Sequence, residues 1–183
     1  MDAEELKAKL EEIHLSGYGW AVSCCHGDRA EAEDVLQTAY LKILEGKAVW
    51  REKSSFQTWF FAVIRKTALD HLRRAWVRKL FGLRQSEKRE VEKHNLDERV
   101  QRLQEHELFR KILENLPRRQ REVLHLVFYH ELSLSQAAEV MNVSIGSARQ
   151  HYERGKKRLK ELLEEKKVYA TKWSRRETTS IVP

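Results

Sequence analysis

The side chains best suited to chemistry lie together near the C-terminal end, in residues 145–163. This segment holds six Arg and Lys residues against two Glu, which gives it a net charge of +4. An Arg side chain can donate two hydrogen bonds to guanine, and a Gln side chain can pair in a similar way with adenine. Basic side chains further along the same helix can hold phosphates. The segment therefore indicates binding of a nucleic acid. The residues that we expect to face outward are Ser147, Arg149, Gln150, His151 and Arg154, followed by Lys156 and Lys157 at the DNA backbone.

The segment before it predicts how such a helix is held. Ser133 or Ser135 can cap a short helix, and Asn142 stands in the turn, where Asn adopts a left-handed conformation more easily than most residues. Ser144 can then cap the basic helix. This order predicts a helix-turn-helix, whose second helix enters the major groove of DNA. A plain helical hairpin within a core is the alternative, but it would not need the exposed donors. The expected inner face consists of Ala137, Ala138, Met141, Ala148, Tyr152 and Leu159.

Charge is unevenly distributed along the rest of the chain. The protein has 183 residues and a formal net charge of +7. Residues 28–45 carry a net charge of −3, whereas residues 65–89 carry +7. Two basic segments on one chain favour a polyanion that is contacted at two places. Either segment alone would be interpreted as an ordinary solvated helix face.

The sequence gives little indication of a catalytic, cofactor or metal site. The eight His residues are scattered, and no Gly-rich phosphate loop, paired carboxylates or Ser/His/Asp set stands out. We therefore expect no enzyme, no cofactor and no metal site. Cys24 and Cys25 are neighbours, which suits two small core residues better than a disulfide or a zinc site, with a redox role as the alternative.

Membrane insertion is not expected either. Charged residues make up 34% of the chain, and no run of about 18 apolar residues occurs that would span a bilayer. The N-terminal sequence MDAEELKAKLEE is acidic, unlike a secretory signal, which begins with a basic stretch and an apolar core. We therefore expect a cytoplasmic protein.

The elements that position these residues are predicted to be helices almost throughout. Pro occurs only at positions 117 and 183, and no stretch alternates in the manner of a strand. One helix is expected from about Ala3 to Cys25, a second over residues 31–45, and a third from Ser54 or Ser55 to about Leu72. The second helix has an apolar face made by Ala32, Val35, Leu36, Ala39, Tyr40, Ile43 and Leu44.

A polar stretch divides the chain into two parts. The apolar pattern is lost between about residues 84 and 105, resumes at Leu108, and is broken once by Leu116-Pro117. The sequence therefore predicts an all-α fold with two small helical domains joined by a polar linker. The expected ranges are residues 1–80 and 105–165 for the domains, 81–104 for a flexible linker and 166–183 for a disordered tail.

Four sequence segments together resemble one known family. "GDRAEAEDVLQTAYLKIL" followed by "SSFQTWFFAVIRKTALDHLRR" resembles region 2 of the extracytoplasmic-function (ECF) subfamily of sigma factors, which belongs to the sigma-70 family. "LENLPRRQREVLHLVF" with the helix-turn-helix segment resembles region 4 of the same proteins. The resemblance covers about residues 8–165. It implies a sigma region 2 helical bundle followed by a region 4 helix-turn-helix.

The resemblance also implies a role for each set of residues. In such a sigma factor, an acidic helix binds the β′ clamp helices of core RNA polymerase, here through Asp34, Gln37, Thr38 and Leu41. The following segment opens the −10 promoter element and captures a flipped base, here through Trp50, Phe61 and Lys66, with Arg65, Arg73 and Arg74 on phosphates. Relatives usually have Asn where Lys66 stands. Region 4 binds the −35 element as duplex DNA, and the further partners implied are the β flap and an anti-sigma factor.

Two alternatives from other classes remain open at this point. The first is a helix-turn-helix regulator of the response-regulator type, which would bind duplex DNA as a dimer without polymerase. The second is a helical interaction protein with no role on DNA. The first would normally carry a receiver domain, whose strands the sequence does not predict.

Overall fold

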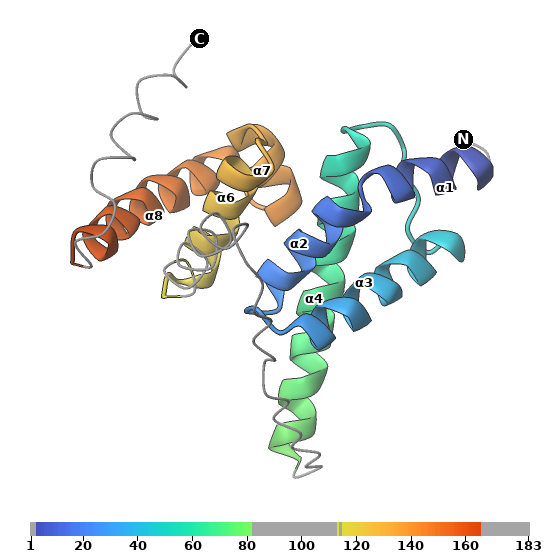
Figure 1. Ribbon diagram of the computed structural model, residues 1–183, viewed down its shortest axis with the longest axis horizontal. Helices are drawn as coiled ribbons and strands as arrows, with labels where there is room; N and C mark the ends of the chain where they lie inside the picture. The colour runs from blue at the N-terminus through green and yellow to red at the C-terminus, as the bar shows by residue number, and fades with distance from the viewer. Residues whose placement is uncertain (1–2, 82–112, 114, 166–183) are drawn as a thin grey trace, which may run out of the picture.

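The regular structure is helical in every part of the chain that the structure describes. The computed structural model describes residues 3–81, 113 and 115–165 (Figure 1). Within these ranges the helices form two units, which confirms the predicted all-α fold. Residues 82–104 of the predicted linker and the predicted tail at 166–183 lie outside the described residues, as do Leu108 and Ile112.

The N-terminal unit consists of four helices around a buried aromatic core. They are α1 (Ala3–Glu12), α2 (His14–Cys24), α3 (Arg29–Leu44) and α4 (Phe56–Leu80). Helices α2, α3 and α4 all pack against one another. The prediction of one helix from Ala3 to Cys25 is wrong, because the chain breaks at Ile13. After the break, α2 approaches α4 so closely that a Cβ on Gly17 would lie 2.6 Å from Phe60 Cε1.

Short polar residues set the ends of these helices. Asp28 caps α3, since its side chain accepts a hydrogen bond from the Glu31 N–H at 2.9 Å. Ser55 caps α4 in the same way, with its Oγ 3.1 Å from the Thr58 nitrogen. The predicted inner face of α3 is buried except at Tyr40 and Leu44. Tyr40 is half-buried and Leu44 is exposed, so the prediction for Leu44 is wrong.

The C-terminal unit consists of α6 (Arg118–Tyr129), α7 (Leu134–Met141) and α8 (Ile145–Glu165). Pro117 immediately precedes α6, where its missing N–H costs nothing. Helix α8 packs against both α6 and α7. At the α6–α8 contact, a Cβ on Gly155 would lie 3.1 Å from Leu124 Cδ1, so the two backbones approach closely.

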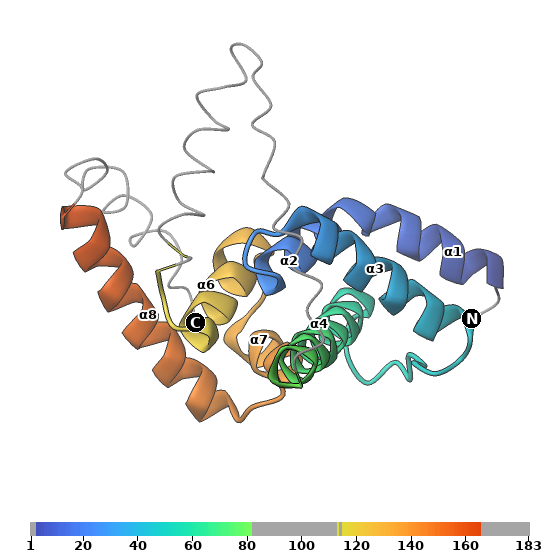
Figure 2. The same ribbon diagram turned by 90° about the horizontal axis from the view of Figure 1, so that it is seen from below.

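The two units pack against each other. Helix α7 lies against α4 and α6 lies against α2, while α8 lies on the outer side (Figures 1 and 2). Trp20 is fully buried, and its indole Nε1 donates a hydrogen bond to the Phe61 carbonyl oxygen at 3.0 Å. The long helix α4 thus contributes one side to its own bundle and another side to the C-terminal unit.

Cys24 and Cys25 are both free thiols that lie in the core, as predicted. Burial is the main cause that raises the pKa of Cys24 well above its ordinary value and the pKa of Cys25 to about 12. Because the thiolate is the reactive form, both cysteine side chains are unreactive while the protein is folded. Among the described residues, no helix is long and apolar enough to cross a membrane.

Candidate nucleic-acid interface

The helix-turn-helix is built by the caps that the sequence predicts. Ser133 and Gln136 form a reciprocal capping box at the start of α7. Asn142 then takes the left-handed conformation, with φ 51° and ψ 55°. Ser144 begins α8, since its Oγ accepts a hydrogen bond from the Ser147 N–H at 3.1 Å. These features fix the angle at which α8 leaves the turn.

The face of α8 opposite this packing is open to solvent. Arg149, Gln150 and Arg154 are exposed, whereas Ala148 and Leu159 are buried against the other helices. The basic end of the same face continues at Lys157, which is exposed. Four of the seven residues predicted on α8 are therefore accessible, within the first four turns of the helix.

Two other predicted residues of α8, Ser147 and Lys156, already have partners close by along the chain, and a third, His151, has a lowered pKa. The hydroxyls of Ser147 and Ser144 are hydrogen-bonded at 2.9 Å. Lys156 lies over the Tyr152 ring, 4.8 Å from its centroid, and pairs with Glu153 at 3.4 Å. The pKa of His151 is lowered, first by burial and then by neighbouring Arg side chains, so its imidazole is neutral near pH 7.

Five of the six residues predicted to contact the −10 element lie on α4, where they do not share one face. Lys66, Arg73 and Arg74 are exposed, whereas Phe61 and Arg65 are almost fully buried. Positions 61 and 65 point about 110° away from positions 66 and 73 around the helix axis. The structure therefore does not bring these five residues together on one surface.

Phe61 and Arg65 lie at the contact between the two units. The guanidinium Nη2 of Arg65 donates a hydrogen bond to Glu122 Oε2 on α6 at 3.0 Å, and both side chains are buried. The Phe61 ring contacts His130 with a centroid distance of 4.5 Å. In this arrangement neither residue is available to a DNA strand.

Trp50 lies in the loop between α3 and α4 and is half-buried. Its Nε1 donates to the Ser54 carbonyl oxygen at 3.0 Å, which fixes the plane of the indole. The ring meets the edge of Phe56, and the Lys9 ammonium lies 6.0 Å from its centroid. Phe56 and Trp59 pack against the core, as predicted for these two residues.

The four residues predicted to bind polymerase share one exposed face of α3. Asp34, Gln37, Thr38 and Leu41 recur at helical spacing, and all four are exposed. Leu41 is 56% exposed, which is unusual for an apolar residue next to a well-packed core. The opposite side of α3 is the face that packs on α2 and α4.

Comparisons with known proteins decide between the open alternatives. Residues 18–78 match Sigma-70 region 2, and residues 106–159 match Sigma-70, region 4. Together these matches span more than half of the sequence, in the order of the two units. The chain belongs to the sigma-70 family. Sigma factors are regulatory subunits of RNA polymerase, not enzymes by themselves.

Two sigma factors of Bacillus subtilis (strain 168) are similar in sequence. RNA polymerase sigma factor SigZ is 24% identical over 139 residues, which is 75% of either chain. ECF RNA polymerase sigma factor SigX is 28% identical over 146 residues, which is 75% of this chain and 73% of SigX. The sigma-70 assignment thus extends over most of the sequence.

Two solved structures share the fold. Sigma factor RpoE in complex with the anti-sigma factor NepR, from Bartonella quintana, matches with a TM-score of 0.68 at 22% identity, over 88% of this chain and 98% of that one. CnrH in complex with the cytosolic domain of CnrY matches with a TM-score of 0.64 at 18% identity, over 90% of either chain. At these identities the likeness concerns the fold.

Two features of this sigma-70 protein were not singled out from its sequence. Arg78 joins Arg73, Arg74 and Val77 around a shallow hollow on α4, and the only sequence signal was its place in the basic segment. Trp20 connects the two units, which nothing in the sequence indicated. The sequence predicts that an aromatic residue in an apolar helix is buried, but it does not show which domain buries it.

Proposed function

We propose that this sigma factor binds core RNA polymerase and directs initiation at promoters that it recognises through a −35 element as duplex and a −10 element as melted DNA. The observation that carries the proposal is the exposed donor face of α8, held by a left-handed turn at Asn142. A helix presented in this way fits the major groove with its N-terminal residues toward the bases.

Recognition of the −35 element is assigned to the first turns of α8. Arg149 and Gln150 are the base readers, because both are exposed and both carry paired donor or acceptor groups. Ser147, His151 and Arg154 flank them. Lys156 and Lys157 lie further along and hold phosphates, which contribute affinity without reading sequence.

Recognition of the −10 element is assigned to α4 and to the loop that precedes it. Trp50 offers an aromatic surface for an unpaired base, a contact worth about 1–3 kcal/mol. Lys66, Arg73 and Arg74 are exposed cations that suit the backbone of the same strand. Phe61 and Arg65 belong to this site only when the C-terminal unit has moved away from α4, because both are covered in the packed arrangement.

Binding to polymerase is assigned to the exposed face of α3. Asp34, Gln37, Thr38 and Leu41 combine an acid, two hydrogen-bonding groups and one exposed apolar side chain. The negative charge of residues 28–45 complements a basic partner, and the β′ clamp helices are the proposed one. We further assign the β flap to region 4, an anti-sigma factor as a regulator, and the cytoplasm as the compartment.

Run-off transcription tests the proposal. The full chain is mixed with core RNA polymerase of its host and with a template library whose −35 and −10 segments are randomised. Enrichment of one promoter class, dependent on the added chain, is the expected result. The double variant Asp34→Ala with Gln37→Ala should lose core binding in fluorescence anisotropy. A chain that binds selected duplex DNA as a dimer, yet does not bind polymerase, would contradict the proposal.

A further inference from the structure

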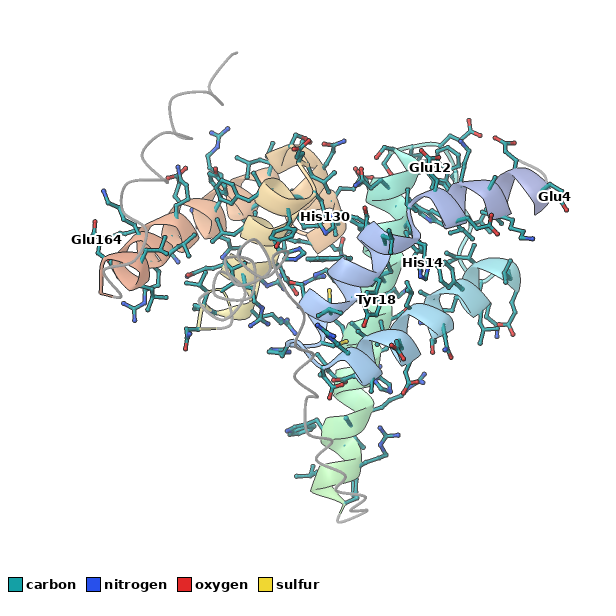
Figure 3. The ribbon with its side chains drawn as sticks, in the orientation of Figure 1. Glu4, Glu12, His14, Tyr18, His130 and Glu164 are labelled. Atoms are coloured by element: carbon teal, nitrogen blue, oxygen red, sulfur yellow. The ribbon has the colours of Figure 1, made fainter. Side chains whose placement is uncertain are left out.

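Two histidines lie at the contact between the two units of this sigma factor. His125 is on α6 and His130 directly follows it, and their ring centroids are 5.0 Å apart. The Trp20 ring on α2 lies 5.6 Å from His125, and the Phe61 ring on α4 lies 4.5 Å from His130. Figure 3 shows His130 between the C-terminal helices and α2. The two imidazoles are thus enclosed by aromatic side chains from the opposite unit.

The surroundings of the two histidines do not stabilise a positive charge on either imidazole. His125 Nδ1 and His130 Nε2 are enclosed atoms with no hydrogen-bond partner among the described residues. A protonated imidazole has an N–H donor at both nitrogens. Protonation would therefore place an unsatisfied, charged donor in an apolar contact, which costs far more than the neutral ring does.

The charged groups around the contact do not offset such a charge. Helix α4 contributes Arg65, α2 contributes Cys24, whose thiol stays protonated, and α6 contributes Arg121. The buried carboxylate is Glu122, and it is already paired with Arg65 at 3.0 Å. Tyr129 stacks on His125 with its neutral ring. The acidic residues on the side of α7 are Glu131, which follows His130 in the chain, and Glu139 on α7 itself, and both are exposed to solvent.

We propose that His125 and His130 form an acid-sensitive latch, which holds region 4 against region 2 at neutral pH and releases it when both imidazoles are protonated. The released form exposes the surface of α4 that carries Phe61 and Arg65. The conformational step stands on the geometry of this contact alone. Its consequence for promoter DNA rests on the proposed function.

The direction of the pH effect follows from the two histidines. Burial lowers the pKa of His125 from 6.5 to about 3 and that of His130 to about 4 in the packed form. In the separated form both rings are solvated and keep their ordinary pKa. The packed form is therefore fully stable above pH 6.5 and loses stability as the pH falls toward about 4 and 3. Between about pH 7.5 and about pH 5.5, each histidine raises the ratio of open to packed molecules about 10-fold, and both together about 100-fold.

Small-angle X-ray scattering of the full chain, without DNA or polymerase, tests the latch. We expect a reversible increase in the radius of gyration of the wild type as the pH falls through the range given above. Circular dichroism at each pH separates domain opening, which keeps the helices, from unfolding, which loses them. The double variant His125→Gln with His130→Gln should stay compact over the same range. His71→Gln is the matched control, because this histidine pairs with Glu31 inside the N-terminal unit and should leave the wild-type response unchanged.

Three results would overturn the latch. The first is a wild-type radius of gyration that does not change with pH while the helices stay intact. The second is a double variant that opens with the same pH dependence as the wild type. If the double variant is already open at neutral pH, the single variants His125→Gln and His130→Gln are measured in its place. The third result is then that neither single variant shows a weaker dependence of the radius of gyration on pH than the wild type. None of these results depends on promoter DNA, so failure of the latch and failure of the proposed function are distinguishable.

Discussion

At the scale of single residues, Arg149 and Lys157 separate two kinds of DNA contact on the same exposed face of α8. Replacing Arg149 with Ala should cost about 1–3 kcal/mol and relax the preference at particular −35 positions, because a bidentate base contact is lost. Replacing Lys157 with Ala should weaken all sequences equally and reduce the salt slope by about 1, because a phosphate contact is lost.

Selection of −35 duplexes from a random pool by each variant measures this difference. Gln150→Ala belongs with Arg149→Ala and should change the selected sequence at a neighbouring position. If Arg149→Ala selects the wild-type consensus, α8 docks differently from the proposed manner. His151 or Arg154 would then be the better candidate for reading bases.

The Arg65–Glu122 pair gives a second prediction at this scale. Both side chains are nearly inaccessible, so Glu122→Gln leaves a buried guanidinium without its counter-charge, at a cost of about 3–5 kcal/mol. Because the pair joins α4 to α6, the protein can escape this cost when the two units separate. We therefore expect Glu122→Gln to be open at neutral pH with its helices intact.

Scattering and circular dichroism on the same sample measure this outcome. Glu161→Gln is the matched control, because Glu161 also pairs with an Arg at 3.0 Å but is exposed on α8. An exposed pair is worth about 0–1 kcal/mol, so the control should remain compact. A compact Glu122→Gln variant with wild-type stability would show that this pair does not hold the units together.

At the scale of elements, the turn at Asn142 gives the third prediction. Its φ of 51° costs an ordinary residue about 1–2 kcal/mol, a cost that Gly avoids and Asn reduces. Asn142→Ala should therefore lower the free energy of unfolding by about 1 kcal/mol, whereas Asn142→Gly should change it little. Urea unfolding measures both variants. Equal destabilisation by Ala and Gly would mean that the Asn side chain itself, not the backbone conformation, stabilises the turn.

Local elements were largely predictable from the sequence, because their signals are local. Asn142 and Ser144 stand where the turn and the cap are, and short polar residues act on their own neighbours. The break at Ile13 was not predictable, because it accompanies the approach of α2 to α4 at Gly17. Val35 and Leu36 are neighbours on α3 and both are buried, whereas at the end of the same helix Ile43 is buried and Leu44 is exposed. Apolarity alone does not say where along a helix the covering by other elements ends.

At the scale of the whole molecule, the sequence predicted those parts of the candidate site that lie on a single helix. It did not predict the parts whose exposure depends on how the two units pack. The exposed residues of α8 and α3 follow from which face of each helix packs. The burial of Phe61 and Arg65 follows from region 4 lying on α4, and residues 57 positions apart form that ion pair. Such a pairing cannot be found from the spacing of apolar residues, because that spacing shows only that one face of a helix is covered and not by which element.

Because the two units pack together, we predict that the two proposed DNA sites differ in accessibility in the free protein. The donor face of α8 is exposed, whereas Phe61 and Arg65 are covered. The free chain at neutral pH should therefore bind a selected −35 duplex but bind a melted −10 strand weakly. Glu122→Gln, which frees α4, should improve binding of the −10 strand and leave the −35 duplex affinity unchanged. Anisotropy with the two labelled DNAs measures both affinities, and Glu161→Gln again serves as the control. Strong binding of the −10 strand by the wild-type chain would mean either that the units separate readily in solution, or that Trp50 and Lys66 suffice without the covered face of α4.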